Sequence, residues 1–248
     1  MTNLLALTSR ELKAFWYSPV AYVVGALFLA LQGFVFWLLI AALNDSQADS
    51  SLTITQAFFG PTFFLVTSLL IMVPFLTMRT FSEEKRTGTI EFLLTAPVTD
   101  TQVVLAKFLG AWLTYLLLWI PTAVFFIVIH HFTPVDWAPI ITGYLGISLL
   151  GGALIACGVL ASSLTRNQVI AAFLSFVVLL LFFLVGLLDW FFRDPETRKV
   201  LHYLSLLDHV VDFSKGILDT RPVVLYLTCG AIALFFTQRV ISNPRWRS

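Results

Sequence analysis

One short stretch of the chain gathers side chains that can do chemistry. Five charged residues fall within nine positions: Glu83, Glu84, Lys85, Arg86 and Glu91. Carboxylates in such a group can activate water as general bases, and charges of both signs can hold a partner protein in register. The choice between these roles depends on which other groups the fold brings near them.

Water activation is the first possibility to test. Glu83-Glu84 together with Phe126-x-x-x-His130 partly matches the motifs of glutamate-type membrane proteases. The match fails because Arg86 follows the second glutamate by two residues instead of four. The expected topology also places the glutamates and His130 about a bilayer apart. The sequence therefore predicts no catalytic residues.

Metal and thiol chemistry are the next possibilities. His130-His131 has only Asp136 as a nearby carboxylate, which does not complete a metal site and favours a non-ligand role at the membrane interface. Cys157 and Cys229 both fall inside apolar runs, where small buried residues are more common than a disulfide or a metal pair. We therefore predict no metal site and no cofactor-binding residue in this chain.

The composition indicates which solvent surrounds the elements that position the charged stretch. The chain of 248 residues is 58% hydrophobic and 12% charged, with a mean hydropathy of +0.90, whereas soluble domains carry about 25% charged residues. A net charge of +1 gives no nucleic-acid signal. The composition predicts a membrane protein without a sizeable soluble domain.

Six apolar segments are long enough to cross a bilayer, for which about 20 residues are needed. They lie at approximately 20–43, 58–78, 103–130, 138–162, 168–188 and 222–240. The first is too long for a signal peptide and lacks a cleavage site. We expect an all-α, polytopic membrane protein in which residues 1–248 form a single transmembrane domain.

Local patterns mark several boundaries of these segments. Ser18-Pro19 is typical of the first turn of a helix. The T-x-x-Q spacing of residues 99–102 predicts a capping box before the third segment. Pro74 and Pro121 should kink the second and third segments. The glycines of the fourth segment, with small residues four apart, favour close helix packing within one subunit over packing at a dimer axis.

The distribution of Lys and Arg predicts the orientation. If the N-terminus is cytoplasmic, ten of the fifteen basic residues fall in inside segments, and the other five lie in or beside the loop between the fifth and sixth segments. This bias favours both termini in the cytoplasm. The charged stretch between the second and third segments is then cytoplasmic as well.

The charged stretch itself has the pattern of a short amphipathic helix over residues 82–96. Ser82 can cap it, Glu83 and Glu84 suit its first turn, and Pro97 ends it. Its apolar stripe comprises Ile90, Leu93 and Leu94. Gly88 weakens the pattern by about 1 kcal/mol, so a charged turn that only fixes topology remains an equal interpretation.

Two further interfacial elements are expected. Residues 3–17 mix aromatic and apolar side chains with Arg10, Glu11 and Lys13, which predicts a helix along the inner leaflet. In the loop from 189 to 221, Asp194-Pro195 can start one helix and Ser205 another. The second carries the stripe Leu206, Leu207, Val210 and Val211, with Asp208, His209, Asp212 and Lys215 on the other side, and ends before Gly216.

The order of these motifs resembles a known family. The charged stretch is similar to the "R…E-x-x-x-G-T-[LI]-E-x-L-L…P…K" signature of type-2 exporter permeases of the ATP-binding-cassette (ABC) class. The positions that carry it are Arg79, Glu83, Glu84, Lys85, Arg86, Gly88, Thr89, Ile90, Glu91, Leu93, Leu94, Pro97 and Lys107. The likeness continues at "SRELKAFWYSPVAYVV", "SSLTRNQVIAA" and "YLSLLDHVVDFSKGILDTRPVVLYL", and looks closest to the gliding-motility-type (GldF-like) branch.

The resemblance implies a subunit architecture and a set of functional residues. It implies six spans per subunit, a homodimer or a heterodimer with a related permease, an optional auxiliary membrane protein, and separate ABC ATPase subunits on the cytoplasmic side of a bacterial inner membrane. The ATPase-coupling residues would be Arg79, Glu83, Glu84, Lys85, Arg86, Gly88, Thr89 and Glu91. Leu206, Leu207, Val210, Val211 and Gly216 would belong to an external gate loop over the outer end of the pathway, and a packing element at the rim of the bundle is an equal interpretation of this loop.

The chain contains no G-x-x-x-x-G-K-[ST] phosphate loop, which agrees with a separate motor. ATP and Mg would then be bound by the partner ATPase, and this subunit would not be an enzyme. Polar residues in the spans are sparse, which suits an apolar or lipid-like substrate. We therefore expect the permease subunit of an ATP-driven exporter. The alternative is a non-transporting, ATPase-driven anchor or assembly component of motility or envelope machinery.

Overall fold

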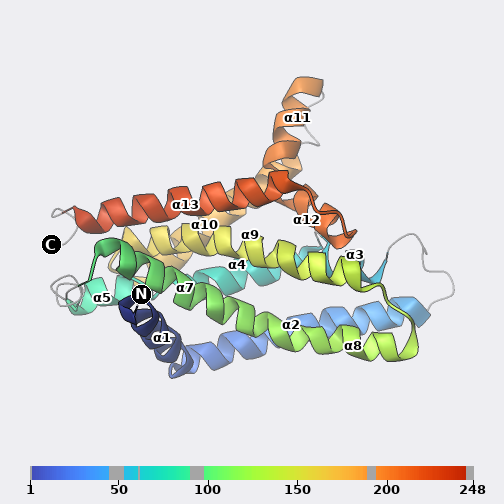
Figure 1. Ribbon diagram of the computed structural model, residues 1–248, viewed down its shortest axis with the longest axis horizontal. Coiled ribbons are helices and arrows are strands. Elements are labelled where there is room, and N and C mark those ends of the chain that lie inside the picture. The colour runs from blue at the N-terminus through green and yellow to red at the C-terminus, as the bar shows by residue number, and fades with distance from the viewer. Residues whose placement is uncertain (1, 45–52, 61, 90–97, 189–193, 244–248) are drawn as a thin grey trace.

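The computed structural model describes residues 2–44, 53–60, 62–89, 98–188 and 194–243. Six of its helical segments are long and apolar enough to cross a membrane, as the sequence predicts. They are α2 (Pro19–Asn44), α4 (Phe63–Thr77), α7 with α8 (Asp100–Trp119 and Ala123–Phe132), α9 (Trp137–Ser163), α10 (Gln168–Leu188) and α13 (Thr220–Ser242). The described residues form an all-α bundle (Figure 1).

The bundle has two ends, which hold different small elements. One end, called the terminal end here, holds α1 (Thr2–Trp16), α5 (Ser82–Thr87) and the last turns of α13. The opposite end, called the far end, holds α3 (Ile54–Phe59), the last turn of α8 and α12 (Leu206–Ser214). The start of α1 and the end of α13 both lie at the terminal end (Figure 1), as expected for an even number of spans.

Two of the predicted helix boundaries are formed as expected. The capping box before α7 is present: Gln102 N donates to Thr99 Oγ1 at 3.3 Å, and Thr99 N donates to Gln102 Oε1 at 3.2 Å. The kink at Pro121 is a 3-10 turn, η1 (Ile120–Thr122), which separates α7 from α8 because proline removes a helical hydrogen bond.

The second span begins later than the sequence suggested. Phe58 and Phe59 belong to α3 and are buried, and the chain breaks at Gly60 before α4 starts at Phe63. Thr62 caps α4 by accepting a hydrogen bond from Leu65 N at 3.2 Å. The continuous helix predicted from residue 58 is wrong because Gly60 precedes a proline, and that position disfavours helical dihedrals.

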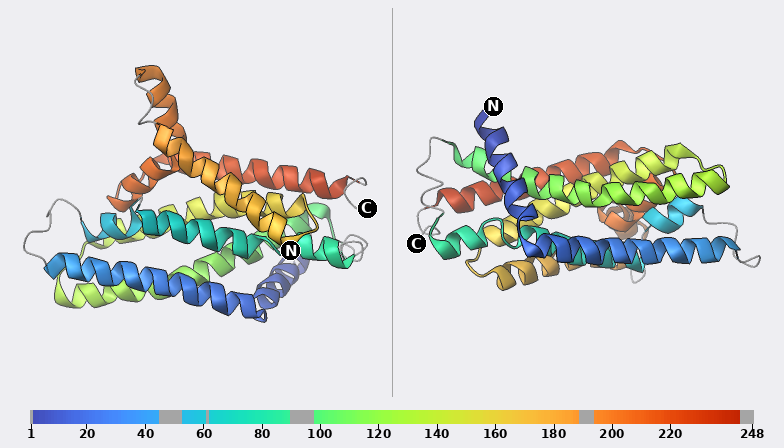
Figure 2. Two further views of the ribbon diagram at one scale, coloured as in Figure 1. Left: turned by 180° about the vertical axis from the view of Figure 1, so that it is seen from behind. Right: turned by 90° about the horizontal axis from the view of Figure 1, so that it is seen from below.

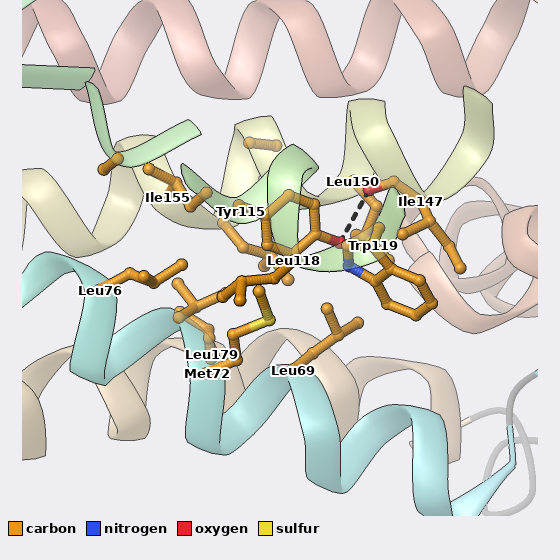
Figure 3. Close-up of a cluster of buried hydrophobic side chains, with 14 of the residues drawn as sticks. Leu69, Met72, Leu76, Tyr115, Leu118, Trp119, Ile147, Leu150, Ile155 and Leu179 are labelled. Atoms are coloured by element: carbon orange, nitrogen blue, oxygen red, sulfur yellow. Dashed lines mark hydrogen bonds between the residues drawn. The ribbon is translucent and has the colours of Figure 1, made fainter. Parts of the chain in front are cut away.

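The most buried span is α9, and α13, α10, α12, α4 and α7 pack around it. Its glycines stand where other elements approach. A Cβ atom at Gly151 would lie 2.3 Å from Tyr115 Cε1, and one at Gly158 would lie 2.4 Å from Thr77 Oγ1. Tyr115 packs with Trp119 and donates its hydroxyl to Ile147 O at 3.1 Å (Figure 3). The glycines therefore serve packing within the subunit, as predicted.

The remaining helices lie outside the main bundle. α1 packs on α7 and crosses the terminal end at an angle to α2 (Figure 2). α11 (Pro195–Leu204) projects sideways from the bundle, whereas α12 returns to pack on α9, α3 and α10 (Figure 1).

Candidate functional site

The charged stretch begins as the helix α5, directly after α4. Phe81 is the N-cap residue, and the Ser82 hydroxyl donates back to Met78 O. The prediction that Ser82 caps this helix is therefore wrong. The backbone N–H groups of Phe81 and Ser82 instead donate to Ser162 Oγ, at 3.1 and 3.2 Å. The hydroxyl of Ser162, near the end of α9, thus replaces a local cap and fixes α5 to the core.

α5 ends at Thr87, because Gly88 has φ = +72°, which is the left-handed region. The predicted single helix over 82–96 is therefore wrong at Gly88, which ends α5 after six residues. Ile90, Glu91, Leu93, Leu94 and Pro97 lie outside the described residues. Their predicted apolar stripe stays a prediction.

Lys107 of α7 links α5 to the N-terminal helix. Its ammonium lies 2.8 Å from Glu84 Oε1 and 3.3 Å from Glu11 Oε2, and 5.2 Å from the centre of the Phe81 ring. Only 3% of the Lys107 side chain is exposed. Arg10 of α1 adds a second cation 3.8 Å from Glu84 Oε1. A buried ammonium with two carboxylates and a ring face is well compensated.

A glycine makes this junction possible. A Cβ atom at Gly110 would lie 2.7 Å from Glu11 Cβ, so only glycine lets α1 come this close to α7. Gly110 stands three residues after Lys107 and therefore on the same face of α7. The close approach sets the carboxylate of Glu11 beside the ammonium of Lys107.

Two more members of the predicted coupling set are bonded within the chain. Arg79 donates to Ser18 Oγ at 2.7 Å, which ties the end of α4 to the start of α2. Lys85 donates to Ser163 O at 2.5 Å, which ties α5 to the end of α9. Arg79, Glu84 and Lys85 thus connect the terminal ends of four spans.

The other described members of the set are exposed or half-buried. Arg86, Gly88 and Thr89 are exposed, and Thr87 and Thr89 share a hydroxyl hydrogen bond of 2.9 Å across the turn. Glu83 is half-buried and lines a cavity at the same end. Residues 86–89 are called the tip here. They offer polar side chains and exposed backbone at the end of the bundle, as a docking surface requires.

Sequence reasoning missed four partners of this junction: Ser18, Arg10, Glu11 and Ser162. The pair Arg10-Glu11 was visible as charge on an otherwise apolar N-terminal helix, but its partners lie far along the chain. Pairing of Glu11 with Lys107 spans 96 positions, a separation that helical periodicity does not address.

The far end holds the second predicted set, on α12. Ser205 caps this helix by accepting from Asp208 N at 3.3 Å, and Gly216 follows it with φ = +86°, both as predicted. Leu206 and Val210 are buried and Val211 is half-buried. The Leu207 side chain lies outside the described part of the structure.

One residue of α12 lies on the other face than predicted. His209 is buried and meets the Tyr226 ring edge-on, with ring centroids 5.8 Å apart, so its assignment to the polar face is wrong. Before α12, the carboxylate of Asp194 accepts hydrogen bonds from Thr197 Oγ1 and N at 2.7 and 3.0 Å, starting α11 as predicted. These bonds lower the pKa of the Asp194 carboxyl.

Among the described residues, the side chains considered for water activation and for metal binding are not brought together. α5 with Glu83 and Glu84 lies at one end of the bundle and the last turn of α8 with His130 at the other (Figure 1). In the described ranges no three His, Cys, Asp or Glu side chains gather closely enough to hold a metal ion. Cys157 of α9 and Cys229 of α13 are free thiols that pack in the same small apolar cluster.

Comparison with known proteins adds one finding. Residues 42–207, two thirds of the chain, match the family model described as "ABC-2 family transporter protein". The matched region runs from the end of α2 to the start of α12 and contains α5, Lys107 and Ser162. The comparison with curated protein sequences gave no match.

Proposed function

This chain belongs to the ABC-2 transporter family and is a multi-pass membrane permease subunit, and we propose that it works as an exporter with the separate ABC ATPase that the family implies. We propose further that α5 is its mechanical link to that ATPase. ATP and Mg would be bound by that partner. The ATPase would dock on the tip, residues 86–89, and its motion would reach the spans through α5.

The observation that carries this proposal is the division of α5 into an anchored and an exposed part. Glu84 and Lys85 bind α7 and the end of α9, and the backbone of Phe81 and Ser82 binds Ser162. Arg86, Thr87 and Thr89 are left exposed beyond them. A force applied at the tip would pass directly to α4, α7 and α9, because α5 is bonded to each.

The proposed orientation places the terminal end in the cytoplasm of a bacterial cell and the bundle in its inner membrane. The bias of Lys and Arg toward the terminal end supports it. α12 with Leu206, Val210 and Gly216 would then cover the outer end of the pathway. We further propose that two copies, or this chain and a related permease, form the pathway between them. The gliding-motility-type branch and an auxiliary membrane protein stay predictions.

The proposed cargo is an apolar or lipid-like molecule. The buried polar residues of the spans are mainly Ser and Thr, and most of those hydroxyls bond their own helix, as Thr77, Thr114 and Thr237 do. Among the described spans, few polar groups are left to line a path for a charged solute. The same sparseness favours the second candidate, a non-transporting anchor driven by the same ATPase. Release of a lipid-like cargo from reconstituted vesicles on ATP addition would exclude that candidate.

A charge reversal at the tip tests the docking proposal. Arg86→Glu should weaken copurification of the ATPase about tenfold or more, since close interfacial charge pairs contribute at least about 1.5 kcal/mol. Lys215→Glu is the matched control, because Lys215 is also an exposed cation but lies at the far end. Wild-type capture and turnover of the ATPase with Arg86→Glu would contradict docking at the tip. Loss of capture in both variants would show a folding defect instead.

A further inference from the structure

A cavity of about 330 Å³ opens at the terminal end, between α1, the start of α2, the end of α4 with α5, and α7. This is roughly ten times the volume of a water molecule in the liquid and falls at the lower end of the range for small-molecule pockets. The coupling proposal above uses none of this space.

The wall of the cavity carries both signs of charge in equal number. Its charged residues are Arg10, Arg79 and Lys107, and Glu11, Glu83 and Glu84. A simple anion or a simple cation would meet as much repulsion as attraction there. A ligand that carries one charge of each sign, with the two ends held apart, can satisfy both groups.

Parts of this wall lack partners within the described chain. Arg79 Nε and Glu84 Oε2 are buried atoms without a hydrogen-bond partner among the described residues. Glu83 makes no ion pair there, although it is half-buried. Buried polar groups are almost always hydrogen-bonded, so an unpaired donor and an unpaired acceptor beside one cavity indicate an occupant that offers both.

Most of the remaining wall is apolar, which favours a lipid over a small soluble ligand. Phe15, Val20, Leu76 and Ala111 line the cavity beside the charges. Next to it in the chain, Tyr17 is 85% exposed and Tyr22 is 63% exposed, and Trp16 meets Tyr22 edge-on at 6.4 Å. Exposed Trp and Tyr gather at the headgroup level of membranes. The cavity therefore lies at headgroup depth.

We infer that this cavity binds the headgroup of a phospholipid that carries a phosphate and a primary ammonium, the headgroup chemistry of phosphatidylethanolamine. The phosphate faces the guanidinium groups of Arg79 and Arg10, whose fork geometry suits phosphate oxygens. The ammonium, with three N–H donors, faces Glu83 and Glu84. The first carbons of the lipid lie on Phe15 and Val20.

This inference needs only the membrane and not the ATPase or the direction of transport. It makes a sharp prediction about lipid choice. A choline headgroup has the same charges but no N–H donor, and a glycerol headgroup has the phosphate but no cation. The site should therefore prefer ethanolamine over choline and over glycerol headgroups when the acyl chains are identical.

The test is native mass spectrometry of the purified full-length chain in detergent with the three lipids added in turn. We expect the ethanolamine lipid to bind at least about fivefold more tightly than the choline lipid. Glu83→Gln should reduce this preference to about twofold or less, because ethanolamine-lipid binding loses a charged acceptor for its N–H groups and should weaken more than choline-lipid binding. Asp100→Asn is the matched control, because Asp100 lies at the same end but does not line the cavity; it should keep the wild-type preference.

Three results would overturn the inference. Equal binding of all three lipids would mean a cavity filled by water. A preference for the glycerol lipid that survives Glu83→Gln would mean an anion site. Displacement of the lipid by free phosphoethanolamine at the lipid's own concentration would mean a site for a soluble zwitterion. The lipid comparison uses the wild-type chain, so it stands even if a variant fails to fold.

Discussion

The ammonium of Lys107 lies 2.8 Å from Glu84 Oε1, and the side chain of Lys107 is 97% buried. A charge that the sequence places inside a span is therefore paired with a glutamate 23 positions earlier. A lysine at the centre of a span costs about 2.5 to 3.5 kcal/mol on the insertion scale, and one near the end of a span, as Lys107 is, costs less. Glu84 and Glu11 offset that cost. The pair also joins α5, α7 and α1 at one point, which explains why a short helix such as α5 is held at the end of the bundle.

Breaking this pair should destabilise the chain. Lys107→Met would leave the partly buried carboxylates of Glu84 and Glu11 with only Arg10, and we expect a loss of about 3 kcal/mol. Glu84→Gln should cost less, because Lys107 keeps Glu11. The double variant should lose clearly less stability than the sum of the two single losses, because it no longer contains the uncompensated carboxylate of Glu84. Unfolding in mixed micelles measures all three.

A control separates pairing from the general effect of charge. Arg166→Met removes an exposed cation at the same end that makes no ion pair with the described residues. It should change stability by less than about 0.5 kcal/mol. Strictly additive costs for Lys107→Met and Glu84→Gln would show that the two side chains do not interact in the membrane.

Local sequence patterns predict some features of this structure and miss others. Six apolar runs, the capping box at Thr99 and the break at Pro121 follow from local chemistry, and each is present. Ser82 also looked like a local cap, but the N–H groups of Phe81 and Ser82 are bonded by Ser162, about 80 positions later. A distant hydroxyl replaced the local one, and no single-sequence pattern encodes that choice.

The glycines and His209 show the same limit. Glycine spacing in the fourth span predicted close packing, but not that Gly151 meets Tyr115 or that Gly158 meets Thr77. The apolar stripe on α12 was predicted correctly at Leu206 and Val210, yet His209 shares their burial because the ring of Tyr226, on α13, lies beside it. Which residues pack closely or are buried therefore depends on side chains from helices that are distant in the sequence.

The contact of Gly151 with Tyr115 gives the second prediction. Gly151→Ala would place a methyl group 2.3 Å from Tyr115 Cε1, and the ring must move. We expect a loss of about 1 to 3 kcal/mol in stability. In a Tyr115→Leu background the same change should cost less, because the ring is absent. Thermal unfolding in detergent gives both values.

Gly33 supplies the matched control, because a Cβ atom there meets nothing within 4 Å. Gly33→Ala should be neutral or stabilise α2, since alanine is the better helix former. Equal losses for Gly33→Ala and Gly151→Ala would refute the packing role of α9 glycines.

The third prediction concerns α12. Val210 is 3% exposed, and Val210→Asp would bury a carboxylate that needs compensation, at a cost above about 3 kcal/mol. Leu218→Asp makes the same chemical change at a residue of the same loop that is 61% exposed, and should be tolerated. Yield of folded protein by size-exclusion chromatography distinguishes them. A normal yield for Val210→Asp would mean that α12 does not pack on the bundle.

Orientation gives the fourth prediction. In a background with Cys157→Ala and Cys229→Ala, single cysteines at Thr87 and Thr133 mark the terminal and far ends. An impermeant thiol reagent should label intact cells only at position 133, and position 87 should react after the membrane is opened. Labelling of position 87 from outside would reverse the proposed topology and remove the ATPase from the tip.

The last prediction concerns the turn at Gly88, which shapes the tip. Its φ of +72° costs an L-residue about 1 to 2 kcal/mol, least for Asn and most for β-branched side chains. Gly88→Asn should therefore keep the turn, and Gly88→Val should distort it. Space is not the issue, because a Cβ atom there meets nothing within 4 Å. The two variants differ in backbone preference and leave every charge in place.

If the tip transmits the motion of the ATPase, Gly88→Val should lower permease-dependent ATP turnover several-fold in reconstituted membranes, and Gly88→Asn should keep most of it. Both variants should insert and should pair Lys107 with Glu84 normally, because Gly88 follows the last anchored residue of α5, Lys85. Whether the Lys107–Glu84 pair persists can be checked in each Gly88 variant by measuring the stability losses of Lys107→Met and Glu84→Gln, singly and together. Equal turnover for the valine and asparagine variants would mean that the backbone at the tip carries no force. The charged stretch would then only fix the topology of the chain.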